Sequence, residues 1–123
     1  KKAAMAVNRI RYWLPVVFFM GYIFYASSRT GTDLPCIFPF QDVVFHFSVY
    51  ALLAWSFGRA LFFEKPGSSF FKIICLCAVF GLLYGISDEY HQRFVQGRTS
   101  DVFDVIVDTI GSFAGGIVLR WLK

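Results

Sequence analysis

The sequence lacks the cysteine patterns of disulfide-rich or zinc-binding proteins. It contains three cysteines, Cys36, Cys75 and Cys77, among 123 residues. Cys75 and Cys77 are two positions apart, so their side chains point to different sides of a helix. Neither a disulfide framework nor a cysteine-based metal motif has this spacing. We interpret the cysteines as small apolar packing residues.

Charged residues are also scarce. They make up 16% of the chain, whereas 57% is hydrophobic and 20% is aromatic. Soluble domains carry about 25% charged and about 45–50% apolar residues, and a short chain buries only about two-thirds of its surface on folding. The composition therefore excludes an ordinary water-soluble domain. The net charge of +4 does not indicate nucleic-acid binding, because the basic residues flank apolar stretches instead of forming one patch.

Four apolar stretches predict a single all-α domain over residues 1–123, an integral membrane four-helix bundle. Each stretch is close to the roughly 20 residues that cross a bilayer. Breakers interrupt the chain between the first two stretches, at Gly31, Pro35 and Pro39. A cleavable signal peptide ending near Ala26-Ser27-Ser28 is an alternative for the first stretch. The expected spans are about 10–27, 43–63, 70–87 and 102–122.

Lysine and arginine are distributed unequally between the two ends of the expected bundle. Of the 12 basic residues, Arg29, Arg93 and Arg98 flank one end, and the remaining nine flank the other. Cytoplasmic flanks carry the excess of basic residues. We therefore expect both termini in the cytoplasm, with the acidic residues other than Glu64 in the outer half.

Small residues predict close packing of the last two spans. Gly81 and Gly85 are four positions apart on the third span, and Gly111 and Gly115 are four apart on the fourth. Small residues at this spacing let helix backbones approach closely.

Carboxylates recur at helical spacing at the start of the fourth span. Asp101, Asp104 and Asp108 lie on one helix face, with Asp108 about 10 Å deeper than Asp101. A charge at that depth is costly unless it is paired, hydrated or protonated. The face should therefore point to the bundle interior or a wet cavity. Asp101 and Asp104 also suit the helix start, as a cap and a first-turn acid.

The other spans carry polar residues at the same end. Asp42, His46 and Tyr50 are each four positions apart and share a face of the second span, although Asp42 also suits a helix cap. Asp88 closes the third span, and Glu89 points about 100° away from it on a helix. The sequence thus predicts that separate helices bring polar groups to one depth.

These residue types suit several chemistries. Carboxylates near a histidine can exchange protons or hold a divalent metal, and Arg98 can grip an anion, or instead pair with these acids. No metal or cofactor is identified from the sequence. Candidate catalytic residues are His46, Asp88, Glu89 and Asp104, and candidate ligand-binding residues are Ser28, Asp42, Gln92, Arg98, Asp101 and Asp108.

Three strings carry a family resemblance over residues from about 10 to 122. They are Tyr25-Ala26-Ser27-Ser28, Asp42-x-x-x-His46-x-x-x-Tyr50, and Asp88-Glu89-x-His91-Gln92-x-Phe94-x-x-Gly97-Arg98-x-x-Asp101-x-x-Asp104-x-x-x-Asp108-x-x-Gly111. With them the chain resembles the VanZ-like family of small bacterial membrane proteins.

The resemblance implies a multi-pass protein of the bacterial cytoplasmic membrane and a role at the cell envelope, with a link to teicoplanin resistance. The expected partners are membrane lipid, and a lipid-linked cell-wall precursor or a lipoglycopeptide antibiotic. Three hypotheses stay open: binding of an amphiphilic ligand, hydrolysis or transfer on a lipid head group, and a purely structural accessory role.

Overall fold

The computed structural model describes residues 1–29 and 37–122 and consists of four helices joined by short segments. No strand occurs in these residues, so the predicted all-α, four-helix architecture is confirmed. Gly31, Pro35, Cys36 and Lys123 lie outside the described residues. The helices are α1 (Lys2–Ser28), α2 (Gln41–Glu64), α3 (Phe70–Gln92) and α4 (Val102–Leu122).

The helix boundaries differ from the predicted spans mainly in α1 and α3. α1 begins at Lys2, well before the apolar stretch. α3 continues to Gln92, five residues beyond its predicted end. Asp88, Glu89 and Gln92 are therefore helical, and all three are buried. A polar segment of this kind stays helical because the bundle supplies buried partners for its side chains.

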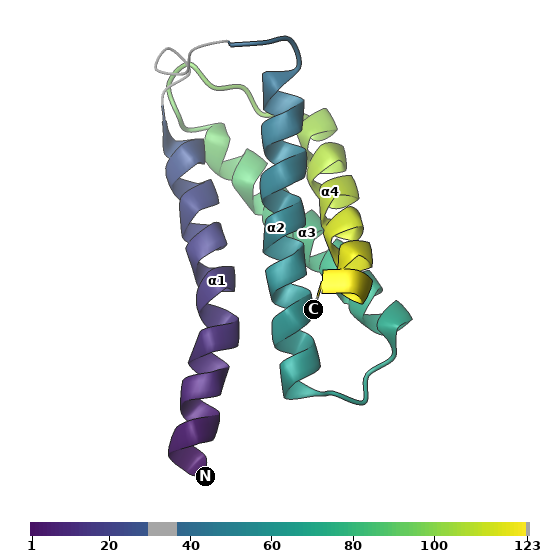
Figure 1. Cartoon of the computed structure of the whole chain (residues 1–123). Helices are drawn as coiled ribbons and strands as arrows, with labels where there is room; N and C mark the ends of the chain where they lie inside the picture. The colour runs from purple at the N-terminus through teal and green to yellow at the C-terminus, as the bar shows by residue number, and fades with distance from the viewer. Residues whose placement is uncertain (30–36, 123) are drawn as a thin grey trace.

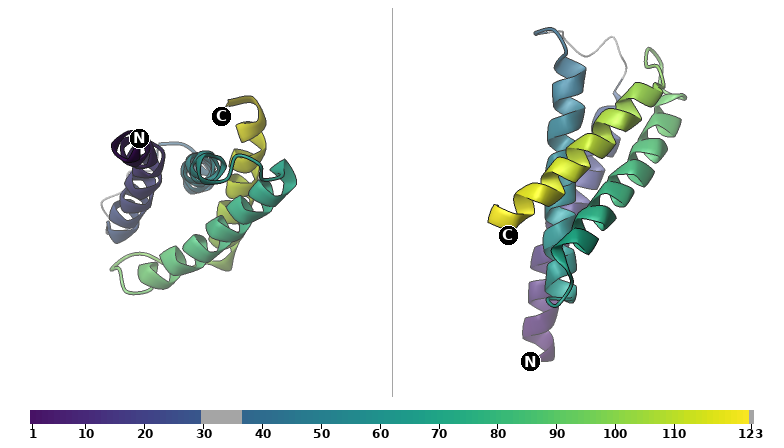
Figure 2. Two further views of the ribbon diagram at one scale, coloured as in Figure 1. Left: turned by 90° about the horizontal axis from the view of Figure 1, so that it is seen from below. Right: turned by 90° about the vertical axis from the view of Figure 1, so that its right-hand side faces the viewer.

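The helices run alternately up and down, and α2 packs against each of the other three (Figure 1). The N-terminus and the turn between α2 and α3 lie at one end of the bundle, at the bottom of Figure 1. The connection from α3 to α4 lies at the other end, and α4 crosses α2 obliquely (Figure 2). The start of α2, the end of α3 and the start of α4 therefore meet at one end, which we call the polar end.

Glycines on α3 bring α3 and α4 together, as the sequence predicts. A side chain added at Gly81 would collide with Ser112, and a Cβ at Gly85 would lie 3.0 Å from the Asp108 carboxylate oxygen Oδ2. Both contacts lie on α4. Small residues on α3 thus make room for polar side chains of α4.

Gly111 and Gly115 of α4 face α2 and not α3. A Cβ at Gly111 would lie 2.5 Å from the carbonyl oxygen of Phe47, and one at Gly115 would collide with the backbone of Ala51. Both of these neighbours belong to α2. The spacing identified close contacts correctly, but the expectation that this pair faces α3 was wrong, because α4 sits between two helices and packs small residues against both.

Local hydrogen bonds define two of the helix starts. The Ser69 hydroxyl accepts from the Lys72 N–H at 3.2 Å at the start of α3. Asp101 Oδ1 accepts from the Phe103 N–H at 3.0 Å, which confirms Asp101 as a cap of α4. Asp42 does not cap α2: the residue before that helix is Phe40, in a left-handed conformation with φ 61°. Asp42 lies in the first turn instead.

Apolar side chains fill the interior and cover much of the surface. Tyr50 and Leu53 of α2 are fully buried, whereas large apolar residues on every helix are exposed, such as Val17, Leu52, Leu83 and Ile110. Three helices, α2, α3 and α4, are long and apolar enough to cross a membrane. Exposed apolar surface of this extent fits a lipid environment, and the crossing of α1 stays a prediction.

Candidate acidic–histidine site

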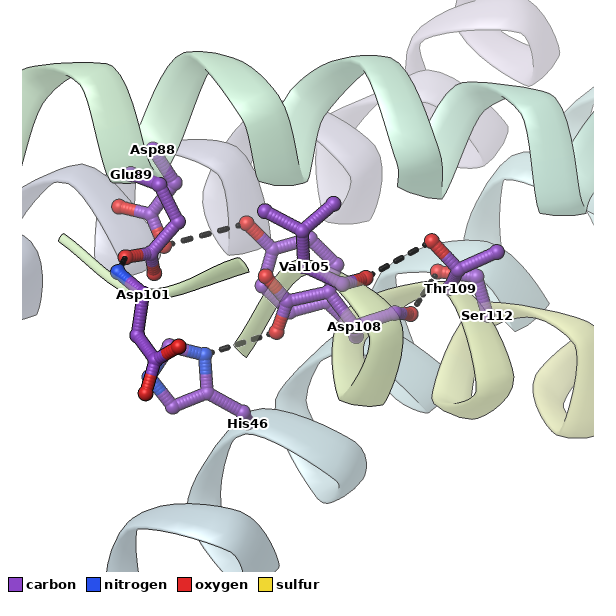
Figure 3. Close-up of polar contacts among 9 residues, drawn as sticks. His46, Asp88, Glu89, Asp101, Val105, Asp108, Thr109 and Ser112 are labelled. Atoms are coloured by element: carbon purple, nitrogen blue, oxygen red, sulfur yellow. Dashed lines mark hydrogen bonds and ion pairs between the residues drawn. The ribbon is translucent and has the colours of Figure 1, made fainter. Parts of the chain in front are cut away.

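A buried histidine–carboxylate pair lies at the centre of the polar end. His46 is on the second turn of α2, and Asp108 is on the second turn of α4. His46 Nδ1 lies 2.7 Å from Asp108 Oδ1 (Figure 3). His46 is 5% exposed and Asp108 is 0% exposed. Each group can be buried because the other satisfies part of its hydrogen-bonding capacity.

Two neighbouring acids of α3 approach the same point. Asp88 is 7% exposed and Glu89 is 4% exposed. The Tyr50 hydroxyl donates to Asp88 Oδ2 at 3.2 Å, and the Asp101 N–H donates to Glu89 Oε2 at 2.9 Å. Although the two side chains leave α3 in different directions, both lie on the buried side at its end.

Four ionisable side chains from three helices thus converge, as Figure 3 shows. One ligand atom from each of them lies within 4.8 Å of the corresponding atoms of the others. We call this group the acidic–histidine cluster: His46, Asp88, Glu89 and Asp108. The convergence at one depth that the sequence predicts is therefore present for these four residues.

Two oxygens of the cluster have no hydrogen-bond partner among the residues that the structure describes. They are Glu89 Oε1 and Asp108 Oδ2, and both are inaccessible to solvent. The second oxygen of each carboxyl group is hydrogen-bonded, to Asp101 and His46 respectively. Buried acceptors without donors are unfavourable, so the cluster has unused capacity to bind a proton, a cation or a hydrogen-bond donor.

A model of the VanZ/LLP1 family matches residues 10–123. The chain belongs to the VanZ/LLP1 family. The match covers α2, α3, α4, α1 from residue 10 onward, and the whole acidic–histidine cluster.

One relative of known sequence comes from Schizosaccharomyces pombe. The uncharacterized protein C11E3.10 of Schizosaccharomyces pombe is 33% identical to this chain over 73 residues, which are 59% of this chain and 43% of that protein. The chain thus spans less than half the length of this relative. No solved structure matches the chain.

The remaining predicted site residues of this VanZ/LLP1 chain surround the cluster at varying distance. Gln92 is buried, and Asp104 is half-buried on the first turn of α4. Asp42 and Asp101 are exposed, although the backbone of Asp101 contacts Glu89. Ser28 is exposed as well, and its hydroxyl donates to the carbonyl oxygen of Phe24 on its own helix at 2.7 Å.

Arg98 contacts backbone carbonyl oxygens at the end of α1, and its expected role in gripping an anion stays a prediction. Its Nη1 donates to the carbonyl oxygens of Ala26 at 3.5 Å and Arg29 at 3.4 Å. The ion pairs within residues 1–29 and 37–122 join Arg9 to Glu64 and His46 to Asp108. Arg98 therefore links the segment before α4 to the end of α1, and the expected pairing with the acids is absent among these residues.

A pocket with aromatic walls reaches the cluster from the side of α1 and α3. Asp88 lies in its lining, and its volume is about 240 Å³. The His91 ring stacks on Phe24 at a centroid distance of 4.6 Å, and His91 Nδ1 lies 3.2 Å from the hydroxyl of buried Ser27. The lining residues are Phe24, Tyr84, Ser87, Asp88, Tyr90, His91 and Phe94.

Some functional residues were missed or undervalued by sequence reasoning. Tyr50 was placed on the face of His46 but not in the site, and its spacing of one turn was the available signal. His91 was not among the candidate site residues, yet it lines the pocket. The serine of α1 that contacts His91 is Ser27, not Ser28. No pattern in the sequence distinguishes these two adjacent serines.

Proposed function

We propose that this VanZ/LLP1 membrane protein binds the polar head of an amphiphilic or lipid-linked ligand at the acidic–histidine cluster. The aromatic pocket that reaches Asp88 is the observation that carries the proposal. A pocket of this kind provides an apolar surface for the hydrocarbon part of the ligand and a polar end for its head group. Positively charged or hydroxyl-rich head groups are favoured, because the polar groups at its end are mainly acceptors.

We further propose that the cluster faces the outside of a cell-envelope membrane. The support is the excess of basic residues at the end that carries the N-terminus and the turn after α2. An outward site suits a phospholipid, a lipid-linked cell-wall precursor or a lipoglycopeptide antibiotic, and the resemblance to the VanZ-like family links it to teicoplanin resistance.

Labelling in whole cells tests the orientation. Gln96→Cys and Gly67→Cys place single exposed thiols at the two ends, in a chain whose native cysteines are replaced by alanine. A membrane-impermeant maleimide should label position 96 and leave position 67 unmodified until the cells are lysed. Labelling of position 67 alone in intact cells would reverse the proposed orientation.

Ligand binding is tested with purified protein in lipid nanodiscs. The probes are photoactivatable phospholipid and teicoplanin, and the variant is Asp88→Asn. We expect cross-links at the pocket between α1 and α3 and at least about a tenfold weaker binding by the variant, as for loss of a charged hydrogen-bonding group. Glu64→Gln, at an acid of the opposite end of the bundle, is the control. Equal binding by all three proteins would disprove the proposal.

Resistance and yield separate a ligand site from a structural network. The same variants are expressed in a teicoplanin-sensitive bacterium, and folded protein is quantified by size-exclusion chromatography. Lost resistance with normal yield supports the site. Lost yield in Asp88→Asn, together with unchanged resistance per folded molecule, would support a structural accessory role instead.

An enzyme is the second candidate, and the geometry of His46 favours it. An imidazole held by a carboxylate at 2.7 Å has the arrangement of an oriented general base. Here the enzyme would hydrolyse or transfer a lipid head group, with the acids of the cluster as proton donors. Product formation from labelled lipid precursors that is lost in His46→Gln, but kept in Glu64→Gln, distinguishes catalysis from binding.

A further inference from the structure

The acidic–histidine cluster contains more negative charge than the protein neutralises. Three carboxyl groups, Asp88, Glu89 and Asp108, lie beside a single imidazole. Within the described residues, neither lysine nor arginine forms an ion pair with any of them. Burial of unpaired carboxylates is strongly unfavourable in a low-dielectric interior. Something else must therefore supply positive charge or protons.

The two unpartnered oxygens identify where that charge is needed. Glu89 Oε1 and Asp108 Oδ2 are buried and accept no hydrogen bond from residues 1–29 or 37–122. The neutral donors, the Tyr50 hydroxyl and the Asp101 N–H, bond other oxygens of the cluster. Since Glu89 is 4% exposed and Asp108 is 0% exposed, bulk water does not satisfy these atoms. We propose that the cluster of His46, Asp88, Glu89 and Asp108 binds one divalent metal ion.

The separations are compatible with coordination. The four ligand atoms lie within 4.8 Å of one another, and two ligands on opposite sides of an ion at about 2.2 Å each would be about 4.4 Å apart. The side chains need to close by only a few tenths of an ångström. Three carboxylates with one imidazole suit hard or borderline ions of the Mn²⁺, Fe²⁺ or Zn²⁺ class more than soft ions, because no thiolate belongs to the set.

Surrounding groups already orient the ligands as outer-shell partners of a metal site do. The Tyr50 hydroxyl holds Asp88, and the Asp101 N–H holds one oxygen of Glu89, which leaves the other oxygen free. Gly85 closes against Asp108 Oδ2, where a Cβ would lie only 3.0 Å away. Partners of this kind fix ligand direction and raise metal affinity by about 10–100-fold.

This inference rests on the proposed function, because the metal ion would occupy the same cluster. A bound ion would also change the class of ligand that the cluster binds. An acidic cluster alone repels phosphate, but a divalent ion attracts phosphate and carbonyl oxygens. With the ion bound, a phosphate-bearing lipid head at Asp88 becomes the favoured ligand class. Without the ion, cationic or hydroxyl-rich head groups are favoured.

Metal binding is measured directly on the full chain in detergent. The protein is stripped with a chelator, dialysed and titrated with Mn²⁺, and the free ion is followed by electron paramagnetic resonance. We expect about one Mn²⁺ per chain and an affinity at least about tenfold lower in Glu89→Gln and Asp108→Asn. Glu64→Gln, at the opposite end of the bundle, is the control and should bind as the unmodified chain does. Equal binding by all four proteins, or no binding by the unmodified chain, would overturn the inference.

Thermal stability of the unmodified chain tests the inference even if the variants do not fold. Excess Mn²⁺ should raise the Tm of the unmodified chain, because an ion that binds only the folded state stabilises it. An unchanged Tm overturns the inference. A higher Tm of Glu89→Gln than of the unmodified chain in metal-free buffer, with no Mn²⁺ response in either, would show that the cluster holds protons.

Lipid binding in the presence of the chelator distinguishes the two proposals. If the chelated chain binds phospholipid and the chelator-free titration shows no Mn²⁺ uptake, the proposed function stays intact and the metal inference is overturned. Stoichiometric Mn²⁺ with no bound amphiphile supports the metal site and contradicts the proposed function.

Discussion

The two ion pairs of the described chain have nearly equal lengths but lie in opposite surroundings. At the polar end, His46 Nδ1 is 2.7 Å from Asp108 Oδ1, with side chains 7% and 0% exposed. At the other end, Arg9 Nε is 2.8 Å from Glu64 Oε1, with side chains 56% and 28% exposed. The exposed pair is also bidentate, and Trp13 donates to it.

The comparison shows that the length of an ion pair does not determine how much the loss of one partner destabilises the protein. Solvent can replace either partner at the exposed end, so the pair stabilises little and its loss is tolerated. At the buried end no solvent is available, so removal of one partner leaves the other without compensation. Four substitutions test this contrast, from the largest expected effect to the smallest.

His46→Ala should have the largest effect. It leaves the Asp108 carboxylate buried without its hydrogen-bond partner, which typically destabilises a protein by about 3–5 kcal/mol. Unfolding by denaturant in detergent, followed by circular dichroism, measures the change. His46→Gln is the matched variant, because its amide can donate to Asp108, and it should recover part of the loss. A loss in His46→Ala no larger than that in Glu64→Gln would refute the contrast.

Gly111→Ala should have the second largest effect on stability. It tests packing near the polar end without changing any charge. Its Cβ would lie 2.5 Å from the Phe47 carbonyl oxygen, and a backbone group cannot move aside as a side chain can. We expect a loss of about 1–3 kcal/mol from overpacking. Gly21→Ala on α1 is the control, since nothing lies within 4 Å of its added Cβ, and its stability should be equal or higher. Equal destabilisation by both substitutions would contradict the packing argument.

Tyr50→Phe should have a smaller effect within the buried region. It removes the hydroxyl that donates to Asp88 Oδ2 at 3.2 Å and keeps the aromatic ring. One hydrogen bond of this kind is worth about 1 kcal/mol. The same denaturant experiment checks it, and Mn²⁺ affinity should also fall. Tyr84→Phe, whose hydroxyl bonds the Met20 carbonyl oxygen instead, is expected to leave Mn²⁺ affinity unchanged.

Glu64→Gln should have the smallest effect on the free energy of unfolding. The pair with Arg9 is open to solvent, and a glutamine can still accept from Trp13. Comparison at low and high ionic strength sharpens the test, because the small difference from the unmodified chain should vanish when salt screens the pair. A large, salt-independent loss would show that this end is as sensitive as the polar end.

Local patterns were sufficient to predict the helices and the depth of the polar residues. Apolar stretches of membrane length gave four helices, and helical spacing brought His46 and Asp108 to one level. The end of α3 was predicted too early, because Asp88-Glu89 resembles an interfacial segment until its partners on α2 and α4 are known. α3 continues to Gln92 because Asp88, Glu89 and Gln92 are buried against other helices. The local sequence does not show which helices will bury them.

The neighbours of individual side chains were harder to predict. Gly111 and Gly115 face α2 rather than α3, because small-residue spacing marks a close contact but not the helix that makes it. Ser27 and Ser28 differ by 100° around α1, and only the rotation of that helix in the bundle decides which is buried. Arg98 contacts backbone carbonyls, and its partners depend on a connection whose path the sequence does not specify.

Gly81 and Ser112 share a single small volume between α3 and α4, in which an added side chain at 81 would meet the serine Cβ and hydroxyl. Ser112 in turn donates to the Asp108 carbonyl oxygen at 2.8 Å. The sizes of these two residues are therefore not independent: in a related chain, a larger residue at one position requires a smaller one at the other, or the helices separate. Such a separation would also displace Asp108, which lies one turn from Ser112. The substitutions permitted at positions 81 and 112 are therefore limited by the need to keep Asp108 in place.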